Sequence, residues 1–396
     1  MSKPETCDIF CAVVDNYGDI GVCWRLARQL AHEHNIEVRL WVDDLVSFRR
    51  LCPEIDPPLS LQRVMGVEVR RWSADAFPPL PQPLSHEGER GVADLVIEAF
   101  ACNLPERYVA AMAKQADKPV WINLEHLSAE DWVAGCHGLP SPHPSLPLTK
   151  YFFFPGFTPD TGGLLLERDL MVRRDTFQGD PQAMNAFWQA LGVPPAKQDE
   201  VRVSLFSYEN TALPKLLAAW AEGDTPIRCL LPEGRALPQV VRFFGREQAA
   251  VGEVLHRGQL EAQVLPFMRQ DRYDELLWAS DINFVRGEDS CVRAQWAGKP
   301  FVWHIYPQHD GVHSQKLRAF MTCYGQGLPA AASSALHQLW EAWNGEGDAT
   351  AGWQEFYAQR EVLRHHTQAW AQRLLYNNLA LNLLDFFRQV GRIRAS

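Results

Sequence analysis

The sequence lacks several features that would assign it to a class at once. No uninterrupted apolar run reaches the roughly 18 residues that a membrane-spanning helix requires, so we expect no membrane partner. The first residues, MSKPETCDIF, lack the basic flank and the apolar core of a secretory signal peptide. The patterns GxSxG and GxxxxGK(S/T) are also absent, which excludes the nucleophile elbow of α/β-hydrolases and the P-loop.

The sequence also contains no pattern of paired cysteines and no excess of positive charge. The nine cysteines form no CxxC pair, and because their number is odd they cannot all be paired within the chain. We therefore expect reduced thiols and a cytoplasmic location. The 38 Lys and Arg residues against 48 Asp and Glu residues give a net charge of −10, which argues against nucleic acid as a partner.

The pattern that is present is an alternation of short apolar strands and amphipathic helices. It runs through both halves of the 396 residues and is typical of an α/β protein with parallel sheets covered by helices. The length is sufficient for two domains, each with its own core. Residues 178–200 are polar and predict the region between the domains, so we place one domain at 1–185 and the other at 200–369.

Residues 281–308, DINFVRGEDSCVRAQWAGKPFVWHIYPQ, carry a specific pattern. Residues 282–285 predict a buried strand, residues 286–290 a polar loop, and residues 291–297 a helix. A polar loop that follows a parallel strand and leads into a helix is where α/β proteins bind anionic ligands. This stretch therefore predicts an anion site, although Asp289 and Ser290 could instead be ordinary helix caps.

A second polar loop follows the predicted strand at residues 9–14. Its Gly18 and Gly21 do not complete a GxGxxG motif, and the carboxylates of Asp15 and Asp19 would repel a phosphate. Two interpretations stay open. Asp19 could cap the following helix, or Asp15 and Asp19 could face a cationic or proton-donating substrate.

No pattern predicts a metal site. His309 and His313 are four residues apart, as helical zinc ligands are, but no third ligand stands at a suitable spacing. Asp43 and Asp44 resemble the acidic metal motif of some sugar transferases, yet nothing else supports that role, and we expect a solvated loop there.

The stretch at 281–308 resembles the nucleotide-sugar motif of GT-B glycosyltransferases. The resemblance rests on the order of Gly287, Ser290, Ala294, Gly298, Pro300, Pro307 and Gln308. In the GT-B fold two Rossmann-like domains face each other across a cleft, with the nucleotide diphosphate held by the C-terminal domain and the acceptor by the N-terminal one. By analogy with that fold, the helix at 370–392 is expected to pack on the first domain.

Longer strings resemble one family, the elongation factor P arginine rhamnosyltransferases. They are DNYGDIGVCWRLARQL, INLEHLSAEDWV, KYFFFPGFTPDTGGLLLERDL, SLFSYEN, LPFMRQDRYDELLWASDINFVRGEDSCVRAQWAGKPFVWHIYPQ and HSQKLRAF, and together they extend over nearly the whole chain. A Pro- and Gly-rich stretch at 80–92 departs from the family and looks like an insertion. The resemblance implies transfer of L-rhamnose from dTDP-β-L-rhamnose to an arginine of elongation factor P, with inversion and without a metal cofactor. That modification would activate the factor for translation of polyproline stretches.

The resemblance also implies roles for particular residues. Asp15, Asp19 and Glu288 match the catalytic acids. The positions that match the donor site are Phe206, Tyr208, Phe267, Gln270, Arg286, Asp289 and Ser290, and the backbone of Gly18 and Gly21 would lie near the substrates. Phe267, with Phe206 or Tyr208, would sandwich the thymine ring, and Gln270 would supply an amide.

The chemistry of arginine agrees with these roles. A guanidinium group stays protonated near neutral pH and is a poor nucleophile, so a transferase must grip, orient and partly deprotonate it with carboxylates. We expect Asp19 to act as the base or to orient the nucleophile, and Asp15 to orient the arginine. Glu288 would position the acceptor or stabilise the oxocarbenium-like centre. Which acid takes the proton stays open, as do a GT-B transferase with a different acceptor and a non-catalytic binding module.

Overall fold

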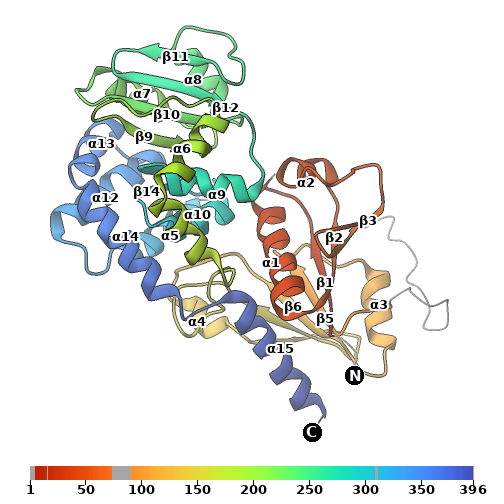
Figure 1. Ribbon diagram of the computed structural model, residues 1–396. Helices are drawn as coiled ribbons and strands as arrows, with labels where there is room; N and C mark the ends of the chain where they lie inside the picture. The colour runs from red at the N-terminus through yellow and green to blue at the C-terminus, as the bar shows by residue number, and fades with distance from the viewer. Residues whose placement is uncertain (1–4, 16, 74–90, 308–310, 396) are drawn as a thin grey trace. The chain divides into compact units, whose positions relative to one another are not determined.

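The computed structural model describes residues 5–15, 17–73, 91–307 and 311–395, and the chain forms two compact units (Figure 1). Unit 1 comprises Met1–Arg168 and Leu374–Ser396, and unit 2 comprises Asp169–Arg373. Most of the stretch at 80–92 lies outside the described residues. No helix within the described residues is both long and apolar enough to cross a membrane. All nine cysteines are free thiols, as the sequence predicted.

Unit 1 is built on an eight-stranded sheet in the order β3-β4-β2-β1-β5-β6-β8-β7. All neighbouring strands are parallel except for β3 with β4 and β7 with β8. Its elements are β1 (Thr6–Cys11), α1 (Gly18–His34), β2 (Glu37–Val42), α2 (Leu45–Leu51), β3 (Leu61–Val64), β4 (Val67–Arg71), β5 (Leu95–Ala99), α3 (Glu106–Lys114), β6 (Val120–Leu124), α4 (Trp132–Cys136), β7 (Pro140–Pro142), β8 (Thr149–Phe153) and α15 (Leu379–Ala395).

Helices cover both faces of this sheet. The connections β1–α1–β2 and β5–α3–β6 run outward from the centre in opposite directions, so right-handed crossovers place α1 and α3 on opposite faces. On the α3 face, Tyr108 and Met112 are buried against Phe10 and Trp121. The C-terminal helix α15 packs against α1 and β6, which brings the end of the chain into unit 1 (Figure 1).

Unit 2 is built on a six-stranded sheet in the order β11-β12-β10-β9-β13-β14, in which only the β11–β12 pair is antiparallel. Its elements are α5 (Leu170–Gly179), α6 (Pro181–Ala190), β9 (Val201–Leu205), α7 (Leu213–Glu222), β10 (Ile227–Pro232), α8 (Leu237–Phe243), β11 (Val254–Arg257), β12 (Leu260–Leu265), α9 (Gln270–Ala279), β13 (Ile282–Arg286), α10 (Gly287–Ala297), β14 (Phe301–His304), α11 (Val312–Tyr324), α12 (Ala330–Trp343), α13 (Ala349–Ala358) and α14 (Arg360–Leu374).

The segment before β9 belongs to unit 2 rather than to a region between domains. The polar residues at 178–200 suggested a linker, and 169–185 was placed with the first domain. In the structure, Phe187 and Trp188 of α6 are buried in one cluster with Leu230 and Leu265 from the sheet of unit 2. This apolar face of α6 attaches the segment to the second core, although its opposite face is polar.

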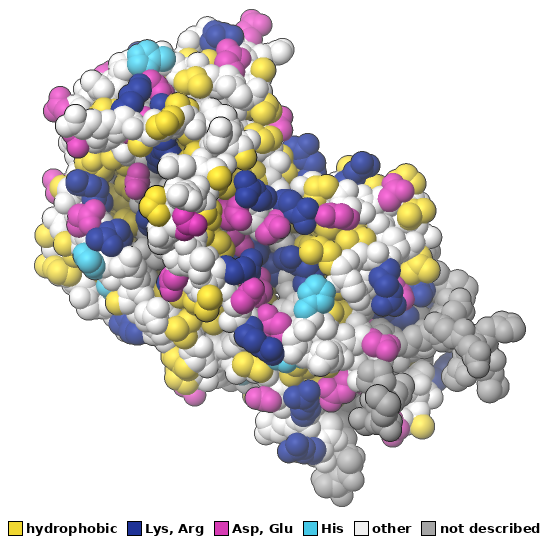
Figure 2. Space-filling model, viewed as in Figure 1, with side chains coloured by type: hydrophobic (Ala, Val, Ile, Leu, Met, Phe, Trp, Pro, Cys, Tyr) yellow, Lys and Arg dark blue, Asp and Glu magenta, His cyan; other side chains and the backbone are white. Residues whose placement is uncertain are grey.

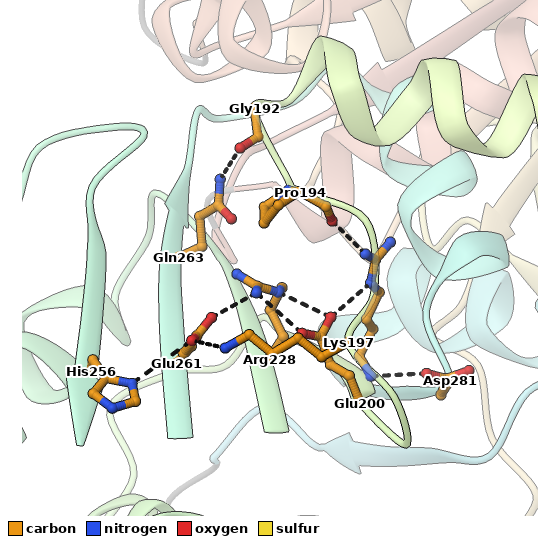
Figure 3. Close-up of polar contacts among 10 residues, drawn as sticks. Gly192, Pro194, Lys197, Glu200, Arg228, His256, Glu261, Gln263 and Asp281 are labelled. Atoms are coloured by element: carbon orange, nitrogen blue, oxygen red, sulfur yellow. Dashed lines mark hydrogen bonds and ion pairs between the residues drawn. The ribbon is translucent and has the colours of Figure 1, made fainter. Parts of the chain in front are cut away.

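Polar contacts join the strands of unit 2 at the amino edge of its sheet (Figure 3). The guanidinium of Arg228 on β10 lies between two carboxylates, with Nε 3.1 Å from Oε1 of Glu200 and Nη2 2.6 Å from Oε2 of Glu261. Lys197 and His256 also contact Glu261. These charges pair with each other at the amino edge, whereas ligands of parallel sheets bind at the opposite, carboxyl edge.

Both sheets share the strand order of Rossmann-like folds. The chain proceeds from β1 outward through β2 and β4, then returns to the other side of β1 with β5; in unit 2, β9, β10 and β12 are followed by β13 beside β9. Ligands of such sheets bind at the carboxyl ends of the strands where the order reverses. The structure therefore predicts one site after β1 and β5 and another after β9 and β13.

Candidate active site

The loop after β1 is held by two carboxylates through three consecutive backbone N–H groups. The N–H of Val13 donates to Oδ1 of Asp43 at 2.9 Å. The N–H groups of Val14 and Asp15 both donate to Oδ2 of Asp19, each at 2.9 Å. Asp19 itself is buried in the first turn of α1, where the helix dipole favours its negative charge. This part of the chain is therefore a fixed support for the Asp15 side chain.

These contacts correct two expectations. Helix α1 begins at Gly18, inside the stretch that the sequence predicted as a polar loop, and its N-cap is Tyr17, so Asp19 does not cap the helix. Its carboxylate instead accepts hydrogen bonds from residues that precede the helix. The first turn looked like a loop in the sequence because it contains two glycines and an acid, which have weak helix preference.

Gly18 allows the Asp15 carboxylate to lie close to the start of α1. A Cβ atom at position 18 would be 2.8 Å from Oδ2 of Asp15, and the N–H of Gly18 donates to the carbonyl of Asp15 at 2.8 Å. Any larger residue would move this side chain. Gly21 lies inside α1 and is buried, with its N–H bonded to the carbonyl of Tyr17 at 2.9 Å.

Asp43 is a residue of this site that the sequence did not identify. Its neighbour Asp44 caps α2 by accepting from the N–H groups of Val46 and Ser47, each at 3.0 Å. Asp43 instead reaches the loop after β1, because β1 and β2 are parallel neighbours and both end at this edge. Asp43 is exposed, as expected for a solvated loop, and it also holds the loop after β1. The parallel pairing of two predicted strands was the signal that could have revealed this contact.

In unit 2, an arginine and two aromatic rings meet at the carboxyl ends of β9 and β13. The guanidinium carbon of Arg286 lies 4.6 Å from the ring centre of Phe206 and 4.5 Å from that of Tyr208. Arg286 and Tyr208 are buried, so these cation–π contacts are more stabilising than they would be in water. The family resemblance implied that Phe206 or Tyr208, with Phe267, sandwiches the thymine ring; in the structure both Phe206 and Tyr208 contact the cation that ends β13.

His304 ends β14 directly beside Arg286, and it stays neutral. Burial lowers the pKa of its imidazole to about 3, and the charges of Arg286 and His313 act in the same direction. Its ring packs edge-on against Tyr208, with centroids 5.2 Å apart. In this pair the positive charge for an anion therefore comes from Arg286 and not from His304.

In the string RGEDS, Arg286 ends β13 and the other four residues, 287–290, lie in a helix and not in a loop. Gly287 has φ +67°, which turns the chain from β13 straight into α10 without an intervening loop. The N-cap is Arg286, so Asp289 and Ser290 are not caps; Asp289 accepts from Nε2 of Gln270 at 3.1 Å, and the Ser290 hydroxyl donates to the carbonyl of Arg286. The first turn of α10 thus stands at the carboxyl edge, where its dipole favours an anion.

Glu288 has a cationic neighbour that sequence reasoning missed. Nζ of Lys316 on α11 lies 3.4 Å from Oε1 of Glu288, and both side chains are largely buried. Lys316 belongs to HSQKLRAF, one of the strings that resemble the family, but that string did not indicate a role for Lys316. The pair holds the Glu288 carboxylate in one orientation in the first turn of α10.

The implied site residues therefore form two groups. Asp15, Asp19, Gly18 and Gly21 gather after β1 in unit 1. Phe206, Tyr208, Gln270, Arg286, Glu288, Asp289 and Ser290 gather after β9 and β13 in unit 2, with Phe267 in the loop before α9, where its N–H donates to Glu233 at 3.3 Å. Each group occupies the reversal point of its own sheet. Among the residues that the structure describes, no three His, Cys, Asp or Glu side chains gather as metal ligands do.

Comparison with known proteins gives a consistent result. The family model described as "Elongation-Factor P (EF-P) rhamnosyltransferase EarP" matches residues 7–388. A protein-arginine rhamnosyltransferase of Pseudomonas putida KT2440 is 50% identical over 384 residues, which cover 97% of this chain and 98% of the relative. A solved structure that concerns EarP-mediated arginine glycosylation of translation elongation factor EF-P is 36% identical, with a TM-score of 0.68 over 97% of this chain and 99% of that one.

A more distant structure supports the fold alone. A UDP-glucosyltransferase from Polygonum tinctorium that can glucosylate indoxyl aligns over the whole of both chains with a TM-score of 0.53 at 8% identity. The two Rossmann-like sheets, the match over nearly the whole chain and the close relatives lead to one conclusion. The chain belongs to the family of EF-P rhamnosyltransferases and is a glycosyltransferase with the GT-B fold.

Proposed function

We propose that this protein transfers L-rhamnose from dTDP-β-L-rhamnose to an arginine side chain of elongation factor P, with inversion and without a metal. The observation that carries the proposal is the pair of acids at the reversal point of unit 1. A phosphate would be repelled there, whereas a guanidinium would be attracted. A relative that is named a protein-arginine rhamnosyltransferase, with 50% identity over 384 residues, supports the same acceptor group.

In the proposed reaction a guanidinium nitrogen attacks the anomeric carbon while the bond from that carbon to the diphosphate oxygen breaks. Attack from the face opposite the leaving group inverts the anomeric centre. The nitrogen loses a proton to a carboxylate, and the diphosphate leaves with the bonding electron pair. Asp19 is suited to accept the proton, because its orientation is set by two backbone N–H groups, and Asp15 is suited to orient the arginine.

The second group of residues is suited to the donor. The buried guanidinium of Arg286 and the first turn of α10 place positive charge where a leaving diphosphate gains negative charge. Glu288, held by Lys316, would position the acceptor or stabilise the oxocarbenium-like centre. Since Arg286 and the helix dipole supply this charge, the leaving group needs no metal ion.

The decisive experiment is transfer with purified components. The protein is incubated with elongation factor P and dTDP-β-L-rhamnose in the presence of EDTA, and the factor is analysed by mass spectrometry. A deoxyhexose increment on one arginine is expected, and it should disappear when that arginine is replaced by lysine. Absence of the increment while the nucleotide sugar still binds would contradict the acceptor and favour a GT-B transferase with a different one.

Replacement of Arg286 by lysine is expected to weaken donor binding. Lysine keeps the charge but loses the planar group that lies against Phe206 and Tyr208, so the Kd for dTDP should rise about tenfold or more. Isothermal titration calorimetry measures this Kd. The control is Arg318→Lys on α11, whose side chain is half exposed and pairs with Glu346. Equal affinities of the Arg286 variant and the wild type would remove Arg286 from the donor site.

Asp43 is expected to act as a positioning residue. Asp43→Ala removes the acceptor of the Val13 N–H, so the loop that carries Asp15 should shift and kcat should fall about tenfold. Asp43→Asn keeps an oxygen at Oδ1 and should retain most of the rate. Asp44→Ala, which removes only the α2 cap, should cost about 1 kcal/mol of stability and leave kcat unchanged. Equal losses in the Ala and Asn variants at position 43 would contradict the positioning role.

A further inference from the structure

The loop after β5 holds three residues in a conformation that side chains rarely adopt. Phe100, Ala101 and Asn103 have φ of +55°, +53° and +57°. These are three of the six non-glycine residues with positive φ in the part of the chain that the structure describes. Such backbone is costly unless the surrounding structure enforces it, and it concentrates at functional sites.

Buried polar groups enforce this conformation. The N–H of Ala101 donates to Oδ1 of Asn123 at 3.1 Å, and that of Asn103 donates to Oε1 of Glu98 at 3.1 Å. Asn123 and Glu98 are 0% and 1% exposed. The N–H of Phe100 donates to the carbonyl of Leu124 at 2.7 Å. A strained loop with this many fixed donors keeps one shape at the surface.

This loop lies beside the acids of unit 1. Strands β1 and β5 are parallel, and Phe10 of β1 lies opposite Glu98 of β5, so both strands end at the same edge of the sheet. The Cys102 thiol contacts the carbonyl of Phe10 at 3.4 Å, which joins the loop to the end of β1. The reversal point that holds Asp15 and Asp19 is thus bordered by the strained loop.

The loop carries a stacked aromatic pair at the surface. The ring of Phe100 is half-buried and stacks on the exposed imidazole of His126, with centroids 4.5 Å apart and planes 15° from parallel. Ala101 and Asn103 are exposed next to it. Planar groups such as peptide units and guanidinium stack on surfaces of this kind.

We propose that residues 100–103 and His126 form an acceptor platform, a surface that contacts the segment of the acceptor protein carrying the target arginine. The platform keeps that segment in register while Asp15 and Asp19 engage the guanidinium. The positive φ angles of the loop are then explained by its function, because they keep an exposed contact surface in one fixed shape at this edge. This inference rests on the proposed function, because it takes elongation factor P as the acceptor.

Two variants test the platform through steady-state kinetics with elongation factor P as the varied substrate. His126→Ala removes the stacked ring and is expected to raise the KM for the factor about tenfold. Ala101→Gly relieves the left-handed strain, so the Tm should stay equal or rise, while the looser loop should raise the same KM about threefold. In both variants the KM for dTDP-β-L-rhamnose should stay unchanged and kcat should stay within about threefold.

The control is His143→Ala in the loop between β7 and β8. His143 also lies near an aromatic ring, with centroids 6.4 Å from Trp121, but its loop adjoins the amino end of β8 at the opposite edge of the sheet. The KM of the His143→Ala variant for elongation factor P should equal that of the wild type. If the wild type modifies the factor and both platform variants keep its KM, the platform is wrong. If the wild type does not modify the factor, the proposed function fails and the platform fails with it.

Discussion

The Asp19→Asn variant is expected to fold normally and to transfer sugar about 10²- to 10⁴-fold more slowly than the wild type. The amide oxygen of asparagine can still accept from the N–H groups of Val14 and Asp15, so the loop after β1 keeps its shape. What the substitution removes is the negative charge that attracts the guanidinium and can take its proton. Single-turnover transfer to elongation factor P measures the loss directly, because it excludes product release.

Two comparisons separate chemistry from structure in this experiment. The Tm of Asp19→Asn should equal that of the wild type, whereas Asp19→Ala should lower it, because two backbone donors then lose their acceptor. Asp44→Asn is the matched control, since Asp44 also accepts two backbone N–H groups but only caps α2. A normal transfer rate in Asp19→Asn would exclude a role for its charge and leave Asp15 and Glu288 as the candidate bases.

The Arg39→Ala variant is expected to lose about 3–5 kcal/mol of the free energy of unfolding of unit 1, because it leaves the Asp8 carboxylate buried without its cation. Arg39 and Asp8 are 1% and 0% exposed, and Nε of Arg39 lies 2.8 Å from Oδ1 of Asp8. The Tyr108 hydroxyl also donates to Asp8. Burial and the charge of Asp8 raise the pKa of Tyr108 well above its ordinary value, so it stays a donor over the accessible pH range.

Chemical denaturation followed by tryptophan fluorescence measures this loss, with Arg63→Ala as the control. Arg63 also pairs with an acid, Glu68, but its side chain is 71% exposed, so its removal should change stability by less than about 1 kcal/mol. Because the chain has two units, the transition of unit 2 should stay in place while that of unit 1 shifts. Equal stability of the two variants would mean that water reaches Asp8 when Arg39 is absent.

The interior strands could be predicted closely from sequence. The predicted strand at 282–285 differs from β13 by one residue only, because a parallel strand with both faces covered must be apolar along its whole length. The beginnings of the two functional helices were placed about one turn too late. Their first turns, at Gly18 and Gly287, contain glycines and acids that are typical of loops. The acids of α10 also have partners far along the chain, Lys316 and Gln270.

The sequence by itself determined the fold class and the family, because these depend on periodicity and on long uncommon strings, and it led to the prediction of which acids act. It did not reveal Asp43, Lys316 or the strained loop at 100–103. Asp43 contacts a residue 30 positions away and Lys316 one that is 28 positions away. Glu98 and Asn123 act on the loop only because β5 and β6 pair. Contacts of this kind leave no local pattern in a chain, so only the tertiary structure decided which side chains hold the predicted acids in place.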